Sequence, residues 1–264
     1  MWRIVKILGI RIGRVGAVFN TLSRKFYDLH GYLLTYYIRQ LSEIPLKGDE
    51  ILPFQVENGK PSFKDPFANN AYNQKRWDLL IDFVTDKELD TLVIFGCAYG
   101  RELYPVAEEL HRNGSKTRII GADFSQEAIE ACRSYALPNA EFHLVDVEEA
   151  EDLRRLFDGI SGNRIGIYMS EVGGYILPDK FRQLVSFVGA KEQVVAFQII
   201  EPMAIEWSAI SLGMIFSFQK SFWRHNYQLY IGEYFKIERT YFIDPRLRTE
   251  THLDQPLWFI CATK

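Results

Sequence analysis

The chain has 264 residues, of which 47% are hydrophobic and 25% are charged, and these globular values exclude a disordered or fibrous protein. The net charge of −3 disfavours nucleic acid as a partner, because duplex-binding domains are usually strongly basic. The three cysteines, Cys97, Cys132 and Cys261, are far apart and form no Cys-x-x-Cys pair. We therefore expect neither a disulfide framework nor a zinc site, and a reducing cytoplasm fits best.

The first 25 residues predict an amphipathic helix with a basic face, whose charges include Arg3, Lys6, Arg11 and Arg14. The same charges interrupt every apolar run, so neither a transmembrane span nor a secretory signal is expected. Two roles remain open for this helix. It could lie on an anionic membrane surface, or it could pack against its own domain or a second subunit.

A second helical pattern covers residues 32–44, and residues 45–70 are rich in proline and glycine, as in an irregular connection. We therefore predict that residues 1–70 form a helical extension and its connection. Residues 71–264 are predicted to form a separate domain.

From residue 71 helices and strands alternate, a pattern typical of a parallel sheet with crossover helices. The strands are expected at 91–95, 117–123, 141–146, 164–170 and 193–200. Helices are expected at 72–86, 126–135, 150–157 and 178–188, and another begins near Glu102. An aromatic-rich helical segment should follow Glu201, ahead of two β-like runs at 234–242 and 257–263.

No helical pattern separates these last two runs, so they should pair as an antiparallel hairpin. The expected fold is α/β and doubly wound, with a seven-stranded mixed sheet that ends in this hairpin.

The segment after the first strand carries the main chemical signal. Gly96 and Gly100 stand at a strand-to-helix turn, where glycine lets a ligand approach the main chain closely. Asp123 ends the second predicted strand, where a carboxylate can accept both hydroxyls of a ribose, and Asp146 ends the third. Either acid alone could be a turn or helix-capping residue. Both together, behind a glycine turn, favour a nucleoside-containing ligand.

In these motifs the chain resembles the class I S-adenosylmethionine-dependent methyltransferases, over residues 91–200. The resembling runs are Ile94-Phe-Gly-Cys-Ala-Tyr-Gly100, Ile119 to Arg133, Ala140 to Val147, and Ile167-Tyr-Met-Ser-Glu-Val-Gly173. The resemblance implies that S-adenosylmethionine is the cofactor, with Asp123 at the ribose and Asp146 beside the adenine. The cofactor contacts that it implies are Gly96, Cys97, Ala98, Gly100, Asp123, Phe124, Asp146, Val147 and Ser170.

Two positions depart from the family pattern. Ile94 replaces the acid that usually ends the first strand, and Ala98 replaces the middle glycine of the loop. In the family the missing acid helps to hold the amino end of the methionine moiety. That end should be held less tightly or in a different way. These departures also motivate the alternative of a binding or scaffold protein that has lost turnover.

A nicotinamide-dependent oxidoreductase is a third hypothesis. The glycine spacing differs from G-x-G-x-x-G, and Glu102 at the start of the next helix would repel a pyrophosphate. A cofactor without a phosphate is therefore favoured.

The acceptor site is less well marked. Glu171, Glu201 and His225 are weak candidates for a general base, and we assign none of them. The two acids could instead be helix-capping or solvated residues, and His225 a surface histidine beside Trp223 and Arg224. No further acid or histidine stands at ligand spacing near Asp146, so no metal is expected there.

Aromatic residues are dense between Trp207 and Tyr234. They could line an acceptor pocket together with the N-terminal extension, or pack the added segments onto the sheet. The first role predicts an apolar small molecule or a lipid-like acceptor. An oligomer is compatible with the sequence.

Overall fold

The computed structural model describes residues 56–57, 60–61, 71–202, 214–217, 222–243 and 257–264. The central strand, β3 (Thr91–Phe95), explains how its layers arise, because successive side chains of a strand point to opposite faces. Leu92 and Ile94 belong to one apolar cluster, and Val93 and Phe95 belong to another. All four side chains are at most 3% exposed, so both faces of the sheet are covered.

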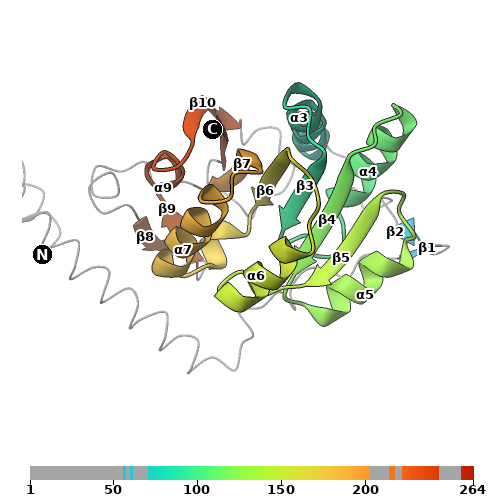
Figure 1. Ribbon diagram of the computed structural model, residues 1–264, viewed down its shortest axis with the longest axis horizontal. Helices are drawn as coiled ribbons and strands as arrows, with labels where there is room; N and C mark the ends of the chain where they lie inside the picture. Colours follow the sequence, from blue (N-terminus) through green and yellow to red (C-terminus); the bar gives the residue numbers. More distant parts are fainter. Residues whose placement is uncertain (1–55, 58–59, 62–70, 203–213, 218–221, 244–256) are drawn as a thin grey trace, which may run out of the picture.

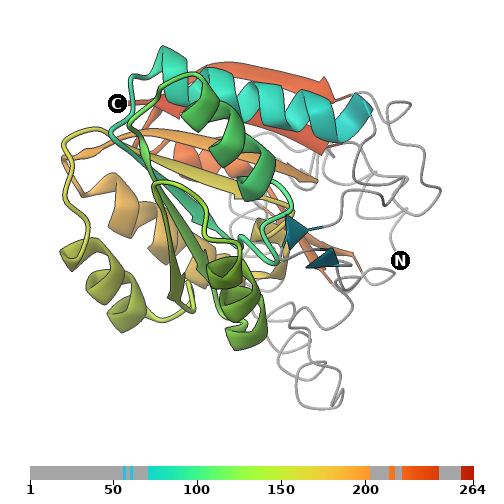
Figure 2. The same ribbon diagram turned by 90° about the vertical axis from the view of Figure 1, so that its right-hand side faces the viewer.

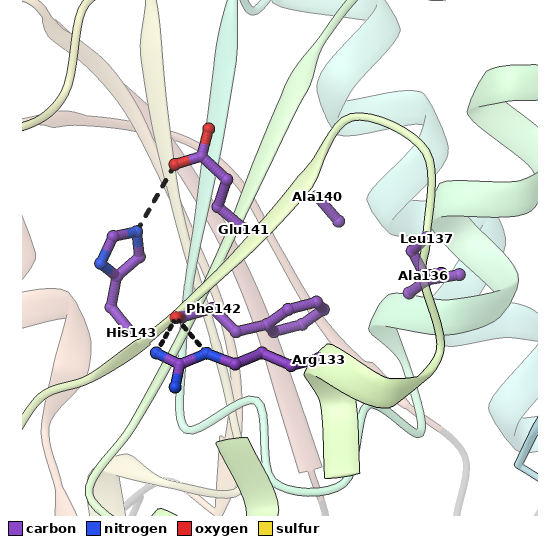
Figure 3. Close-up of a pocket in the computed structure, with 7 residues that line it drawn as sticks. All are labelled: Arg133, Ala136, Leu137, Ala140, Glu141, Phe142 and His143. Atoms are coloured by element: carbon purple, nitrogen blue, oxygen red, sulfur yellow. Dashed lines mark hydrogen bonds and ion pairs between the residues drawn. The ribbon is translucent and has the colours of Figure 1, made fainter. Parts of the chain in front are cut away.

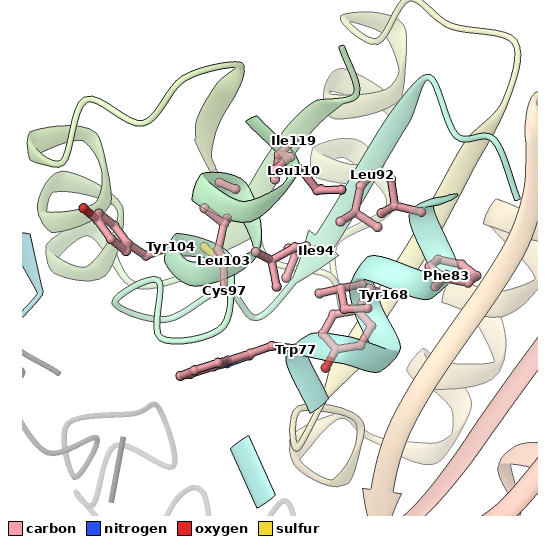
Figure 4. Packing of buried hydrophobic residues seen from close by; sticks show 14 of the residues in the cluster. Trp77, Phe83, Leu92, Ile94, Cys97, Leu103, Tyr104, Leu110, Ile119 and Tyr168 are labelled. Carbon is pink, nitrogen blue, oxygen red and sulfur yellow. The ribbon is translucent and has the colours of Figure 1, made fainter. Parts of the chain in front are cut away.

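Helices from the two halves of the chain supply these clusters (Figures 1 and 2). One face is covered by α3 (Ala71–Asp86), α4 (Leu103–Arg112) and α5 (Gln126–Ser134). The other is covered by α6 (Ala150–Asp158), α7 (Pro178–Gly189) and α9 (Tyr227–Ile231). Figure 4 shows part of the first cluster, where Trp77 and Phe83 of α3 and Leu103 of α4 lie near Leu92 and Ile94.

The main sheet has seven strands in the order β10-β11-β7-β6-β3-β4-β5. Five are parallel: β3, β4 (Arg118–Asp123), β5 (Ala140–Leu144), β6 (Ile165–Ser170) and β7 (Val194–Pro202). The last two, β10 (Lys236–Ile243) and β11 (Leu257–Thr263), pair with each other antiparallel, and β11 is also antiparallel to β7. The predicted seven-stranded mixed sheet with a C-terminal hairpin is therefore confirmed.

The strand order reverses beside β3, which pairs with β4 on one side and with β6 on the other. In open α/β sheets ligands bind outside the carboxyl ends of the strands at such a reversal. β3 leads into the turn at Gly96. β4 ends at Asp123 and is followed by Phe124, and β6 is followed by the loop that contains the 3-10 turn η1 (Gly173–Tyr175). The fold thus gathers at one edge most of the residues that the sequence singled out.

Two expectations about secondary structure are wrong. The segment after Glu201 contains an antiparallel pair, β8 (Met214–Ser217) and β9 (Phe222–His225), where we predicted helix, and among its described residues only α9 is helical. Aromatic and β-branched residues favour strands, and these two runs are rich in them. The third strand ends at Leu144, so Asp146 lies two residues beyond it.

Two short strands, β1 (Val56–Glu57) and β2 (Lys60–Pro61), pair within the predicted irregular connection. The helices predicted at 1–25 and 32–44 lie outside the described residues, and the boundary at residue 70 stays a prediction. None of the helices within the described ranges is long and apolar enough to cross a membrane.

Candidate functional site

In the turn between β3 and α4, every second residue from 96 to 100 has a positive φ angle. The φ angles of Gly96, Ala98 and Gly100 are +69°, +44° and +80°, a left-handed region that favours glycine. A Cβ atom at residue 96 would overlap the side chain of Val172, which lies in the loop after β6. Glycine is therefore required at residue 96 both by the turn and by the close approach of a second loop.

Ala98 adopts a conformation that is uncommon for a residue with a side chain. Two hydrogen bonds hold it there: its N–H donates to Asp123 Oδ2 at 2.9 Å, and its carbonyl accepts from Cys132 Sγ at 3.2 Å. The alanine that replaces the family's middle glycine is thus accommodated by bonds to β4 and α5. Cys97 beside it is buried, and its hydrogen bond with Cys132, together with burial, raises the pKa of its thiol.

Asp123 joins the glycine turn to the end of β4. Its side chain accepts from the N–H of Ala98 through one oxygen and from the N–H of Ser125 through the other, each at 2.9 Å. Burial raises the pKa of Asp123, and main-chain N–H donors from Ser125, Ala98 and Phe124 oppose that shift. A carboxylate has about four acceptor positions, so these bonds leave acceptor capacity for a ligand hydroxyl.

Asp146 and its neighbours lie beside this carboxylate, because the N–H of Val145 donates to the carbonyl of Asp123 at 2.8 Å. Asp146 is half-buried, and its Oδ1 accepts from the N–H of Glu148 at 3.0 Å. Phe124 presents a large apolar side chain that is 38% exposed, and Val147 packs at the edge of the second cluster. An acid flanked by apolar side chains is a suitable setting for a flat heterocycle with an amino group.

An ionic network centred on a buried arginine lies on the other side of the glycine turn. Arg76 of α3 forms an ion pair with Glu102, the residue before α4, and donates to the hydroxyl of Ser170 at the end of β6. The carboxylate of Glu171 lies 3.8 Å from the same guanidinium. Tyr168 donates its hydroxyl to Glu102 Oε2 at 2.5 Å.

Sequence analysis missed Arg76, although a signal for it exists. Buried residues of α3 recur with helical spacing as Asn73, Arg76, Trp77, Leu80 and Phe83. An arginine on that face must be buried, and buried charges need a partner or a ligand.

Glu201 lies at the end of β7 and is 1% exposed. Its Oε1 accepts from the N–H groups of Val172 and Gly173, both at 2.6 Å, and its Oε2 has no hydrogen-bond partner among the described residues. Burial raises the pKa of Glu201 to about 8. The suggested solvated role is therefore wrong for Glu201, whereas its bonds to the first N–H groups of η1 are capping contacts that fix the loop after β6.

His225 ends β9 and is fully buried, so the suggested surface position is wrong. Its Nε2 lies 3.0 Å from the carbonyl oxygen of Gly173 and 3.2 Å from that of Ile176. Two carbonyl acceptors require Nε2 to carry the proton, and burial lowers the pKa of the imidazole to about 4. The turn η1 is thus held by an acceptor from β7 and a donor from β9.

The structure describes only part of the aromatic segment between Trp207 and Tyr234. Tyr227 and Tyr230 are fully buried and pack in one cluster with His225 and Phe181, with ring centroids 5.1 to 6.1 Å apart. These two tyrosines therefore pack an added segment onto the domain. Trp207 and Phe218 lie outside the described residues.

A surface pocket lies elsewhere, along the edge strand β5 and the end of α5 (Figure 3). The charged and polar side chains that line it make contacts within the protein. Arg133 donates twice to the carbonyl of Phe142, and His143 Nε2 lies 3.6 Å from Glu141 Oε2. Among the described residues, no group of three or more histidine, cysteine, aspartate or glutamate side chains is arranged to hold a metal.

No protein-family model matches the sequence, and no curated protein matches it. Solved structures do match. The methyltransferase domain of bacterial CtHen1-CN has a TM-score of 0.51 at 12% identity, covering 73% of this chain and 100% of that one. The small RNA methyltransferase HEN1 has a TM-score of 0.50 at 14% identity, covering 72% of this chain and 25% of that one.

The chain has the class I S-adenosylmethionine-dependent methyltransferase fold. A magnesium protoporphyrin IX methyltransferase from Synechocystis PCC 6803, solved with S-adenosylmethionine bound, matches 93% of this chain and 97% of its own at 14% identity and a TM-score of 0.49. In this methyltransferase fold the described sheet edge carries two groups of residues. Asp123 and Asp146 lie on the β4 and β5 side, and Glu102, Ser170 and Glu171 lie on the β3 and β6 side.

Proposed function

We propose that this chain is an S-adenosylmethionine-dependent methyltransferase that acts on a small-molecule or lipid-like acceptor. The observation that carries the proposal is the hydrogen bond from the Ala98 N–H to Asp123, which makes the glycine turn and the acid of β4 a single unit at the strand reversal. The fold, the glycine turn and Asp123 therefore all favour S-adenosylmethionine as the ligand. When bound, the cofactor supplies an electrophilic methyl group on a sulfonium.

The residues present fit this cofactor. Asp123 retains acceptor capacity for the ribose, and Asp146, Phe124 and Val147 provide an acid and apolar side chains for the adenine. The turn from Gly96 to Gly100, with Cys97 and Ala98 between the two glycines, would bring main chain close to the cofactor. Ser170 lies at the end of β6, on the side expected for the methionine end.

A nicotinamide cofactor is disfavoured by charge. The side chain of Glu102 stands directly before α4, where a dinucleotide fold places a pyrophosphate against the helix N-terminus. The ion pair with Arg76 offsets part of this charge, but the carboxylate still presents oxygens and no donor to a phosphate. A sulfonium cofactor with no phosphate avoids this mismatch.

Methyl transfer needs positioning of the acceptor more than proton chemistry. Glu201 and His225 are poor general bases, because both are buried and both bind the main chain of the loop after β6. Glu171, whose side chain is 35% exposed, stays a candidate. We propose that the acceptor pocket combines the loop at 168–175, the segment from 203 to 234 and part of residues 1–44.

An apolar pocket would exclude water from the sulfonium, whose displacement spreads charge. Peripheral membrane contact through residues 1–25 would suit a lipid-like acceptor.

The acceptor class is tested by incubating the full chain with methyl-labelled S-adenosylmethionine and three separate pools: extracted lipids, a panel of aromatic small molecules, and small RNA. We expect label in the lipid or small-molecule pool, and about 10- to 100-fold less of it with Asp123→Ala when the cofactor concentration is far below its Kd. Label confined to RNA would overturn the acceptor class. S-adenosylhomocysteine binding without turnover in any pool would favour the scaffold alternative.

A further inference from the structure

The ionic network around Arg76 and Glu102 lies where the cofactor proposed above would end. If the adenosine occupies the edge of β4 and β5 at Asp123 and Asp146, the rest of the molecule must extend across β3 toward β6. Charged groups that the described residues place there include Arg76, Glu102 and Glu171, beside the hydroxyl of Ser170. These groups form a mixed site with one cation and two carboxylates.

The usual acid at the end of the first strand is absent, and the structure shows what occupies that place. Ile94 is 3% exposed and pairs in register with Tyr168 of β6, within one apolar cluster. The Tyr168 hydroxyl bonds to Glu102, on the far side of the glycine turn. A carboxylate is therefore held beside the turn, eight positions further along the chain than in the family pattern.

The amino-acid end of S-adenosylmethionine is a zwitterion, so it needs acceptors for an ammonium and donors for a carboxylate. Guanidinium groups bind carboxylates with fixed, directional hydrogen bonds, and buried charges attract more strongly than exposed ones. The side chains of Arg76, Glu102 and Glu171 are 7%, 16% and 35% exposed. The two acids are thus more accessible than the arginine that they flank.

We propose that Arg76 and Glu102 bind the amino-acid end of S-adenosylmethionine in place of the acid missing at Ile94. Arg76 contacts the α-carboxylate, and Glu102 contacts the α-ammonium together with Glu171. This inference rests on the proposed function. The competing role is purely structural, an ion pair that ties α3 to the start of α4 and to β6.

The test compares two ligands by calorimetry on the full chain. S-adenosylhomocysteine has the amino-acid end, whereas 5′-methylthioadenosine has only the 5′-deoxyadenosine and a methylthio group. Glu102→Gln keeps the size of the side chain and should lower the affinity for S-adenosylhomocysteine about 10-fold. Arg76→Met should lower the same affinity about 10- to 100-fold. Affinity for methylthioadenosine should stay within about twofold of wild type, since hydrogen bonds to its ribose and base are retained. Glu141→Gln, which breaks an exposed ion pair with Arg118 on β4 and β5, is the control and should change neither affinity.

The outcomes are distinguishable. A wild-type chain that binds neither ligand would overturn the proposed function itself. Wild-type binding of both, with equal losses or no losses in the folded variants, would overturn only the role of Arg76 and Glu102. If Arg76→Met fails to fold because Glu102 loses its buried partner, Glu102→Gln and Arg76→Lys decide the matter.

Discussion

Asp123→Ala is expected to weaken S-adenosylhomocysteine binding about 10- to 100-fold, which corresponds to about 1.5 to 3 kcal/mol for lost hydrogen bonds to a charged group. Two effects combine. The ribose hydroxyls lose their acceptor, and the N–H of Ala98 loses the bond that helps to hold its left-handed backbone. Isothermal titration calorimetry measures the loss.

Asp179→Ala provides the matched control, because Asp179 is an exposed aspartate on α7. It should bind the ligand as wild type does. Asp123→Asn should fall between wild type and Asp123→Ala, since its amide oxygen can still accept one of the two main-chain bonds. Wild-type affinity in a folded Asp123→Ala protein would remove Asp123 from the cofactor site.

Glu201→Gln is expected to change how stability depends on pH. The folded pKa of Glu201 is about 8, above the ordinary value of 4.5, so the native state binds this proton more tightly than the unfolded chain does. Its contribution to stability is complete below pH 4.5 and declines as the pH rises to 8. Glutamine cannot ionise. The free energy of unfolding of the variant should therefore rise relative to that of wild type by several kcal/mol across this range, at roughly 1.4 kcal/mol per pH unit.

Urea unfolding of both proteins at several pH values from 5 to 9 measures the difference, and subtraction cancels the groups that the two proteins share. Glu149→Gln, at an exposed acid, should follow the wild-type profile. Glu201→Met should be destabilised at every pH, because the N–H groups of Val172 and Gly173 lose their acceptor. Parallel profiles for wild type and Glu201→Gln would show that Glu201 is ionised throughout.

The sequence predicted most of the sheet because its signals are local. The bounds of β3 and β11 were predicted without error, since each is a short apolar run between turn residues. Asp123 was placed correctly because a carboxylate after a buried strand must lie at the carboxyl edge. The pairing of β8 with β9 was missed, because periodicity alone does not separate a short apolar strand from a buried helix segment.

The roles of Glu201, His225 and Arg76 depend on contacts that are distant in sequence. Glu201 bonds to an N–H group 29 residues earlier, and His225 to a carbonyl 52 residues earlier. Periodicity gives no information about such pairs. It could have shown only that Arg76 falls on the buried face of α3, which is the one signal for this network that the sequence contains.

Calorimetric titration of the full chain with S-adenosylhomocysteine, beside an identical titration with NAD, tests most directly whether this fold holds the cofactor. We expect one molecule of S-adenosylhomocysteine to bind per chain and NAD to give no binding heat, because Glu102 stands where a pyrophosphate would lie. Binding of NAD, or no binding of S-adenosylhomocysteine to the folded chain, would contradict the assignment of the glycine turn and Asp123 as a site for S-adenosylmethionine.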